Sequence, residues 1–219
     1  MRYEVFADEL GATLNSALAG HDVDRFDEYC EHLLVRDVLT QQLVGTYRLL
    51  PPAQARRLGR TYCDDAFDLT PLAPLRPQMV ELGRSCVRPG YRQGGVILSL
   101  WSALADFMLR HRLDTMIGCA SIPAGEGHAA DIWQSLRRTH LASACYRVAP
   151  RLPFPIDGSD GFDDGTRTEP PALIKGYLRL GATVLGPPAW DPDFKTADLL
   201  MMMRTADLPA HYLRSRQGD

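Results

Sequence analysis

The stretch ELGRSCVRPGYRQGGVI, Glu81–Ile97, decides the fold of this chain. The mostly apolar run from about residue 77 to 87 predicts a strand, interrupted by one acid and one arginine. Proline and paired glycines predict a turn over 88–95, and apolar residues at 3.6-residue spacing predict a helix over about 94–111. Such a strand, turn and helix N-terminus can bind an anion, because the first N–H groups of a helix point outward. It can equally be a structural unit with solvated arginines.

Two common phosphate-binding loops do not fit this turn. Gly90 and Gly95 have the separation of a P-loop, but Val96-Ile97 replaces the Lys-Ser/Thr pair that would bind phosphate and magnesium. Gly90, Gly94 and Gly95 also lack the G-x-G-x-x-G spacing of a dinucleotide fold. These residues therefore leave only a more general anion site open.

Composition narrows the class of protein. The chain has 219 residues, 45% hydrophobic and 23% charged, which is typical of one soluble globular domain. A net charge of −3 gives no sign of general nucleic-acid binding. The five scattered cysteines form no C-x-x-C pair and the histidines no H-E-x-x-H motif, so we expect reduced thiols and no metal.

The hydropathy pattern predicts a cytoplasmic location. Charged residues interrupt any signal-like core near the start of the chain, and the longest apolar run, Val96–Leu109, has 14 residues and contains Asp106. That run is too short and too polar to span a bilayer. We therefore expect a cytoplasmic protein whose only membrane contact would be peripheral, at the cytoplasmic face of the inner membrane.

Interleaved strand and helix patterns predict a single α/β domain over residues 1–219. We expect helices over 2–18, 125–141 and 172–181, and strands or extended segments over 31–37, 42–50, 113–123, 145–150, 183–194 and 196–204. A short polar turn joins the first two strands, which predicts a hairpin that ends at Pro51-Pro52. Residues 53–75 look irregular or weakly helical, and the Pro-, Gly- and Asp-rich segment at about 152–171 predicts a flexible loop.

The turn also resembles motif A of the GNAT acyltransferases, R/Q-x-x-G-x-G/A, on which the pyrophosphate of a CoA or pantetheine donor lies. Arg92 and Gly95 match this pattern in VRPGYRQGGVI. Ile97 stands where the family has Gly or Ala. This departure favours a donor with a single phosphate, as on an acyl carrier protein, over the pyrophosphate of CoA.

Other segments extend the resemblance over nearly the whole chain. RYEVFADELG, DRFDEYCEHLLVRD, LVGTYRLLPP and ELGRSCV follow one another as in the acyl-homoserine lactone synthases. They are more similar still to the ornithine lipid acyltransferases, often called hemolysin-like. MIGCASIP, PALIKGYLRLGA and DFKTADLL are similar to this second family alone.

The resemblance implies a GNAT-type acyl-CoA N-acyltransferase fold, with a mixed central sheet flanked by helices. Because the chain opens inside the segment that follows the family's first strand, we expect that strand to be incomplete. The implied reaction moves a 3-hydroxyacyl chain from the 4′-phosphopantetheine thioester of acyl carrier protein, or from acyl-CoA, to the α-amine of ornithine. The product would be lyso-ornithine lipid, and we expect no bound cofactor.

Two alternatives stay open at this point. One is an enzyme that makes another N-acyl amino acid or an acyl-homoserine lactone. The other is a catalytically silent GNAT-like module that binds an acyl group or a lipid.

The reaction requires a proton acceptor, because an amine attacks a thioester as the free base. We expect Glu81 to act as this base through a water, or alternatively to pair with Arg84 for structure. A β-bulge near Gly83 would bring Glu81 and Arg84 to one side of the strand. The bulge would also turn the N–H of Cys86 or Val87 toward the thioester oxygen.

Substrate-binding residues are expected around this strand. The residues expected to bind the donor phosphopantetheine are Val87, Arg88, Arg92, Gln93, Gly94 and Gly95. The residues expected to bind the acceptor are Arg25, Asp27, Arg48 and Asp198. Surface solvation or loop capping explains Arg25, Asp27 and Asp198 equally well, and Arg48, like Arg84, could instead pair with Glu81. Cys119, in an apolar strand with no histidine close in sequence, is predicted to be a core residue and not a nucleophile.

Overall fold

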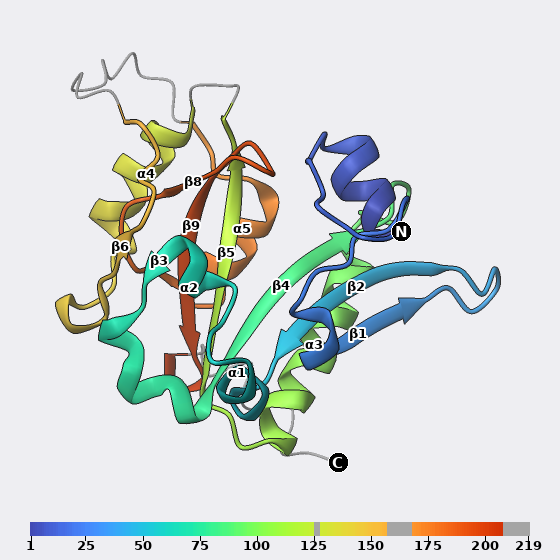
Figure 1. Cartoon of the computed structure of the whole chain (residues 1–219), viewed down its shortest axis with the longest axis horizontal. Coiled ribbons are helices and arrows are strands. Elements are labelled where there is room, and N and C mark those ends of the chain that lie inside the picture. The colour runs from blue at the N-terminus through green and yellow to red at the C-terminus, as the bar shows by residue number, and fades with distance from the viewer. Residues whose placement is uncertain (125–127, 157–167, 208–219) are drawn as a thin grey trace. The chain divides into compact units, whose positions relative to one another are not determined.

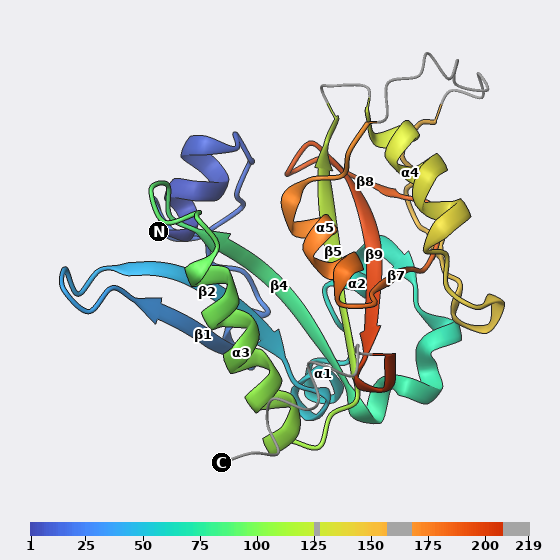
Figure 2. The same ribbon diagram turned by 180° about the vertical axis from the view of Figure 1, so that it is seen from behind.

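The computed structural model describes residues 1–124, 128–156 and 168–207 (Figures 1 and 2). The chain packs as two compact units, the first made of Met1–Tyr62 and Arg76–Asp114 and the second of Cys63–Leu75 and Thr115–Asp219. Residues 157–167 of the expected flexible loop lie outside the described residues. In the described part of the chain, no helix has the length and apolar character needed to cross a membrane.

The first unit is built on three strands that pair antiparallel in the order β1, β2, β4. Its strands are β1 (Glu31–Arg36), β2 (Leu43–Leu50) and β4 (Met79–Val87). Its helical elements are η1 (Glu4–Glu9), η2 (Asp27–Tyr29), α1 (Pro52–Leu58) and α3 (Gly95–Arg110), and η3 (Thr70–Gln78) leads into β4.

Helix α3 packs against the face formed by β1 and β2 (Figure 2). Its buried residues, Leu100, Leu104, Phe107 and Met108, recur at helical spacing on one side. A Cβ added at Gly45 of β2 would overlap the side chain of Val96, so this glycine allows the close approach of helix and sheet. The motif A turn therefore joins β4 to a helix that packs against β1 and β2.

The second unit is centred on β5 and β9, which pair antiparallel along their whole length. Its strands are β3 (Phe67–Asp68), β5 (Thr115–Pro123), β6 (Ala149–Pro150), β7 (Thr183–Val184), β8 (Ala189–Asp191) and β9 (Thr196–Arg204). Its helical elements are α2 (Cys63–Ala66), α4 (His128–Thr139), η5 (Ala144–Tyr146), α5 (Ala172–Arg179) and η6 (Thr205–Asp207). Strands β7 and β8 also pair with β9, and β3 pairs with β6.

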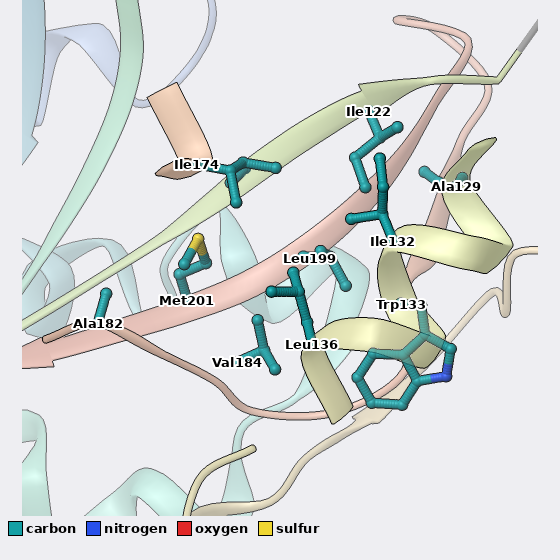
Figure 3. Packing of buried hydrophobic residues seen from close by; sticks show 12 residues of the cluster. Ile122, Ala129, Ile132, Trp133, Leu136, Ile174, Ala182, Val184, Leu199 and Met201 are labelled. Atoms are coloured by element: carbon teal, nitrogen blue, oxygen red, sulfur yellow. The ribbon is translucent and has the colours of Figure 1, made fainter. Parts of the chain in front are cut away.

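The core of the second unit lies between its sheet and the helices α4 and α5 (Figure 3). Ile132 and Leu136 of α4, and Ile174 of α5, belong to the same buried cluster as Leu199 and Met201 of β9. Each of these side chains is at most 5% exposed. The apolar stripe of each helix thus covers one face of the sheet, as helical periodicity requires.

The structure confirms the predicted mixed α/β class, and two element predictions were wrong in extent. The helix predicted over 2–18 ends with η1. Gly11 adopts a left-handed φ of 70°, and its N–H donates a hydrogen bond to the carbonyl of Ala7, which terminates the helix. The strand predicted over 145–150 forms only as β6, since turn hydrogen bonds fold its first residues into η5.

Candidate functional site

A β-bulge in β4 shapes the centre of the first unit. Cys86 pairs with Thr46 and Gly83 with Arg48, so β4 carries one residue more than β2 across this interval. Arg84 occupies the bulge with a φ of 50°, a left-handed conformation that costs a non-glycine residue about 1 kcal/mol. The predicted bulge near Gly83 is confirmed.

Ion pairs of its side chain stabilise Arg84 in this strained backbone conformation. Its Nε lies 3.1 Å from a carboxylate oxygen of Asp22, and its Nη2 lies 3.2 Å from Asp24. The guanidinium also lies over the ring of Tyr62, with 5.3 Å between its Cζ and the ring centroid. The bulge therefore aims Arg84 at the acidic loop that precedes η2.

Three arginines and three aspartates form one connected group, which we call the arginine–aspartate cluster. Its members are Arg2, Asp22, Asp24, Asp27, Arg48 and Arg84. Arg2 contacts Asp22 at 2.8 Å and Asp27 at 2.6 Å. Arg48 contacts Asp24 at 2.7 Å and Asp27 at 3.3 Å. The formal charges balance, which is what allows the cluster to be mostly buried.

The surroundings shift the pKa values within the cluster. Burial alone would raise the pKa of Asp27, but hydrogen bonds from Arg2 and from the N–H of Asp24 lower it to about 2. The nearby charge of Arg48 lowers the same pKa further. Burial opposes the charged form of Arg48, yet Asp24 and Asp27 raise its pKa above the ordinary value. Asp27 and Arg48 therefore stay ionised at neutral pH.

Glu81 lies on β4 beside the bulge and is 6% exposed. The N–H of Tyr62 donates a hydrogen bond of 2.9 Å to its Oε1. The ring of Tyr62 packs edge-on against the ring of Phe26, with their centroids 5.7 Å apart. The guanidinium of Arg48 lies over the same Phe26 ring, with its Cζ 5.7 Å from the centroid. Tyr62 therefore holds Glu81 with its backbone while its ring contacts the surroundings of the cluster.

Motif A follows β4 as a tight turn. Gly90 and Gly94 have left-handed φ values of 87° and 103°, and α3 begins at the next residue, Gly95. A Cβ at Gly94 or Gly95 would meet nothing within 4 Å, so the backbone here faces open space. A ligand could approach this helix N-terminus closely.

Carboxylates of η1 pair with the motif A arginines. Both terminal nitrogens of Arg92 donate to Glu9, at 2.6 and 2.8 Å, and its Nε donates to the carbonyl of Val87. The hydrogen bond from Arg92 lowers the pKa of Glu9 below its usual range. Arg88 lies 3.1 Å from Glu4. A shallow depression beside the turn is lined by Glu4, Asp8, Glu9, Arg88 and Pro89.

The remaining predicted site residues take different places. Cys86 is buried, and burial raises the pKa of its thiol to about 12. Gln93 is exposed on the turn. Arg25 lies over the ring of Phe26, with its Cζ 5.0 Å from the centroid. Asp198 lies in the second unit, where it is buried and accepts a 2.8 Å hydrogen bond from Thr196.

The structure thus brings together some of the predicted residues and adds others. Asp27, Arg48 and Arg84 meet in one cluster, within the same unit as Glu81. Arg2, Asp22 and Asp24 were missed as cluster members. A signal for two of them exists in HDVDRFDEYC, where three aspartates occur within six residues of a loop. The roles of all these residues in binding and catalysis stay predictions.

No group of three or more His, Cys, Asp or Glu side chains in residues 1–124, 128–156 and 168–207 is placed to hold a metal ion. The cluster itself alternates acids with arginines, which would repel a cation.

Comparison with known proteins defines the class. Residues 1–102 match the family described as acetyltransferase (GNAT) domain. A CoA-dependent acyl-homoserine lactone synthase, BjaI, solved with SAM and isopentyl-CoA, superposes with a TM-score of 0.54 at 20% identity, covering 99% of this chain and 78% of that one. The acyl-homoserine lactone synthase LasI gives a TM-score of 0.53 at 15% identity, over 93% of this chain and 78% of that one. These two likenesses support the fold alone, and the matched domain indicates that the first part of the chain has a fold of the GNAT type.

Sequence relatives define the family more closely. The chain is 36% identical over 225 residues to L-ornithine N(alpha)-acyltransferase of Rhodobacter capsulatus, covering 94% of this chain and 83% of the relative. It is 32% identical over 237 residues to the L-ornithine N(alpha)-acyltransferase of Brucella abortus, covering 97% and 81%. The chain belongs to the same family of acyltransferases as these proteins, which confirms the resemblance carried by its motifs.

Proposed function

We propose that the protein transfers a 3-hydroxyacyl chain from acyl carrier protein to the α-amino group of ornithine and releases lyso-ornithine lipid. The relatives named L-ornithine N(alpha)-acyltransferase support this acceptor. The arginine–aspartate cluster near the bulge is the structural observation that carries the proposal. Ornithine presents one carboxylate and two amines, and the cluster offers partners of both signs.

In this mechanism, Glu81 receives the proton that the α-ammonium group must lose before attack. Its position supports the role, because the Tyr62 N–H fixes one carboxylate oxygen while the residue stays mostly shielded from water. The free amine attacks the thioester carbon, an amide bond forms, and the C–S bond breaks. The pantetheine sulfur leaves as a thiolate and takes up a proton, so the reaction is balanced without a redox step.

The oxyanion that forms during attack needs hydrogen-bond donors. The bulge departs from the regular ladder of β4 next to Cys86 and Val87, and a backbone N–H from this segment would supply the donor. The donor phosphate would bind at Val87 to Gly95, where open backbone at the α3 N-terminus and the side chains of Arg88 and Arg92 lie together. Arg92 would exchange Glu9 for the phosphate.

The choice of acyl carrier protein over CoA rests on Ile97. This residue lies in the first turn of α3 at a motif A position where the bulkier pyrophosphate would need a small side chain. A single phosphodiester requires less room. The amphiphilic product also supports a cytoplasmic enzyme that meets the inner membrane only at its surface.

The experiment that tests the proposal offers purified protein matched 3-hydroxyacyl thioesters of acyl carrier protein and CoA, with a panel of amino acids. Mass spectrometry of the products should show N-acylated ornithine, formed faster from the carrier protein. Transfer from acetyl-CoA alone to a soluble amine would overturn the lipid proposal. Transfer to another amino acid would replace ornithine as acceptor, and no transfer from any donor would favour the silent binding module.

A further inference from the structure

Two cysteine thiols lie against each other in the second unit, 56 positions apart in sequence. The Sγ atoms of Cys63, at the start of α2, and Cys119, in β5, are 3.7 Å apart. Neighbouring residues of a strand point to opposite faces, and Ala120 belongs to the core beneath α4 and α5. Cys119 therefore points to the other face of the sheet, where it meets α2.

We propose that Cys63 and Cys119 form a reversible disulfide under oxidation by a hydroperoxide. A disulfide places its sulfurs about 2.05 Å apart, so the gap must close by roughly 1.7 Å, shared between two side chains. Helix α2 has four residues, and a short element of this kind can follow such a movement.

The exposure of the two thiols sets the order of the steps. Cys119 is partly exposed, so the prediction that it is a core residue was wrong, whereas Cys63 is 1% exposed. The peroxide oxidises the Cys119 thiol to a sulfenic acid and is itself reduced to water. The Cys63 sulfur then attacks the Cys119 sulfur, the S–O bond breaks, and a second water leaves with the proton from Cys63. In sum, two thiols and one hydrogen peroxide give one disulfide and two waters.

The other cysteines provide contrasts within the same chain. Burial raises the pKa of both Cys30 and Cys86 to about 12, so these thiols react slowly in the first step, the attack on the peroxide. Cys145 is exposed, so the oxidant can reach its thiol whether or not the disulfide between Cys63 and Cys119 forms. Cys145→Ser therefore serves as the matched control.

The test treats the full chain with hydrogen peroxide, blocks remaining thiols by alkylation and digests the protein with trypsin without reduction. Trypsin releases Cys63 in the fragment 61–84 and Cys119 in the fragment 113–137, with one cysteine in each. We expect these fragments to be joined in the wild type and in Cys145→Ser, and to separate after reduction. Cys63→Ala and Cys119→Ala should not form the joined fragment.

Thermal unfolding gives a second readout. A disulfide that closes a loop of this length should raise the unfolding midpoint by about 5 °C in the wild type and in Cys145→Ser, and in neither alanine variant. Peroxide treatment that leaves 61–84 and 113–137 unjoined in the folded wild type would overturn the proposal. So would irreversible oxidation of Cys119 to sulfinic acid in place of the bond, a result that does not depend on whether any variant folds.

Discussion

Replacement of Arg48 by methionine should destabilise the first unit by about 3 kcal/mol at neutral pH. The side chain is 4% exposed and lies 2.7 Å from Asp24 and 3.3 Å from Asp27. Its loss leaves three carboxylates with two guanidinium groups and a net buried charge. Loss of one partner from a buried pair costs roughly 3–5 kcal/mol, and the lower end applies because Arg84 and Arg2 still hold the two carboxylates.

Equilibrium unfolding in urea measures this loss. Arg57→Met is the matched control, because Arg57 is exposed on α1 and should change the free energy of unfolding by no more than about 0.5 kcal/mol. The double variant Arg48→Met/Asp24→Asn restores two charges of each sign and should recover at least half of the loss. The reasoning fails if Arg48→Met behaves like the control, or if the double variant is no more stable than Arg48→Met alone.

The remaining predictions concern the reaction and the packing around it. Glu81→Gln should lower turnover at least tenfold while the unfolding midpoint stays near that of the wild type, and an unchanged rate would remove Glu81 from the mechanism. Gly45→Ala should destabilise by about 1–3 kcal/mol through overlap with Val96, and Gly45→Ala/Val96→Ala should recover part of this loss in urea unfolding. Arg92→Gln should raise KM for the acyl donor several-fold with little change in stability, since its pair with Glu9 is exposed; steady-state kinetics over a range of donor concentrations would check this. The pKa of Asp27 is lowered from 3.8 to about 2, so its stabilisation is present above pH 4 and is lost as the pH falls toward 2; Asp27→Asn should flatten the unfolding free energy over that window.

Local patterns explain why much of the fold could be predicted. The hairpin of β1 and β2 follows from two apolar runs separated by polar residues, with Pro51 directly after the second strand. Helix α3 follows from periodicity, and its start follows from the glycines of motif A. Each signal lies within a few residues of the element that it specifies, so neighbours in sequence were sufficient.

The charged contacts of the site could not be predicted in the same way. Arg2 lies 20 positions from Asp22, and Arg84 lies 62 positions from the same carboxylate. No periodicity relates such positions, and the pairs form only after β2, β4 and the loop before η2 have packed. The sequence identified Arg48 and Asp27 as site residues, with a pair between Arg48 and Glu81 as the alternative to substrate binding. In the structure, Arg48 pairs with Asp24 and Asp27.

The difference between buried and exposed ion pairs connects the fold to the proposed reaction. Pairs such as Arg48–Asp24 are mostly buried, with side-chain exposures of 4% and 23%. A charged group that leaves such a pair must therefore be replaced by another group of the same sign. The Arg92–Glu9 pair is exposed, with side-chain exposures of 45% and 34%, and water can solvate either partner when the pair opens. A donor phosphate can therefore take Arg92 from Glu9 at little cost. An amino acid that enters the cluster must instead bring its own carboxylate and ammonium groups, and this requirement would select a zwitterionic acceptor over a simple amine.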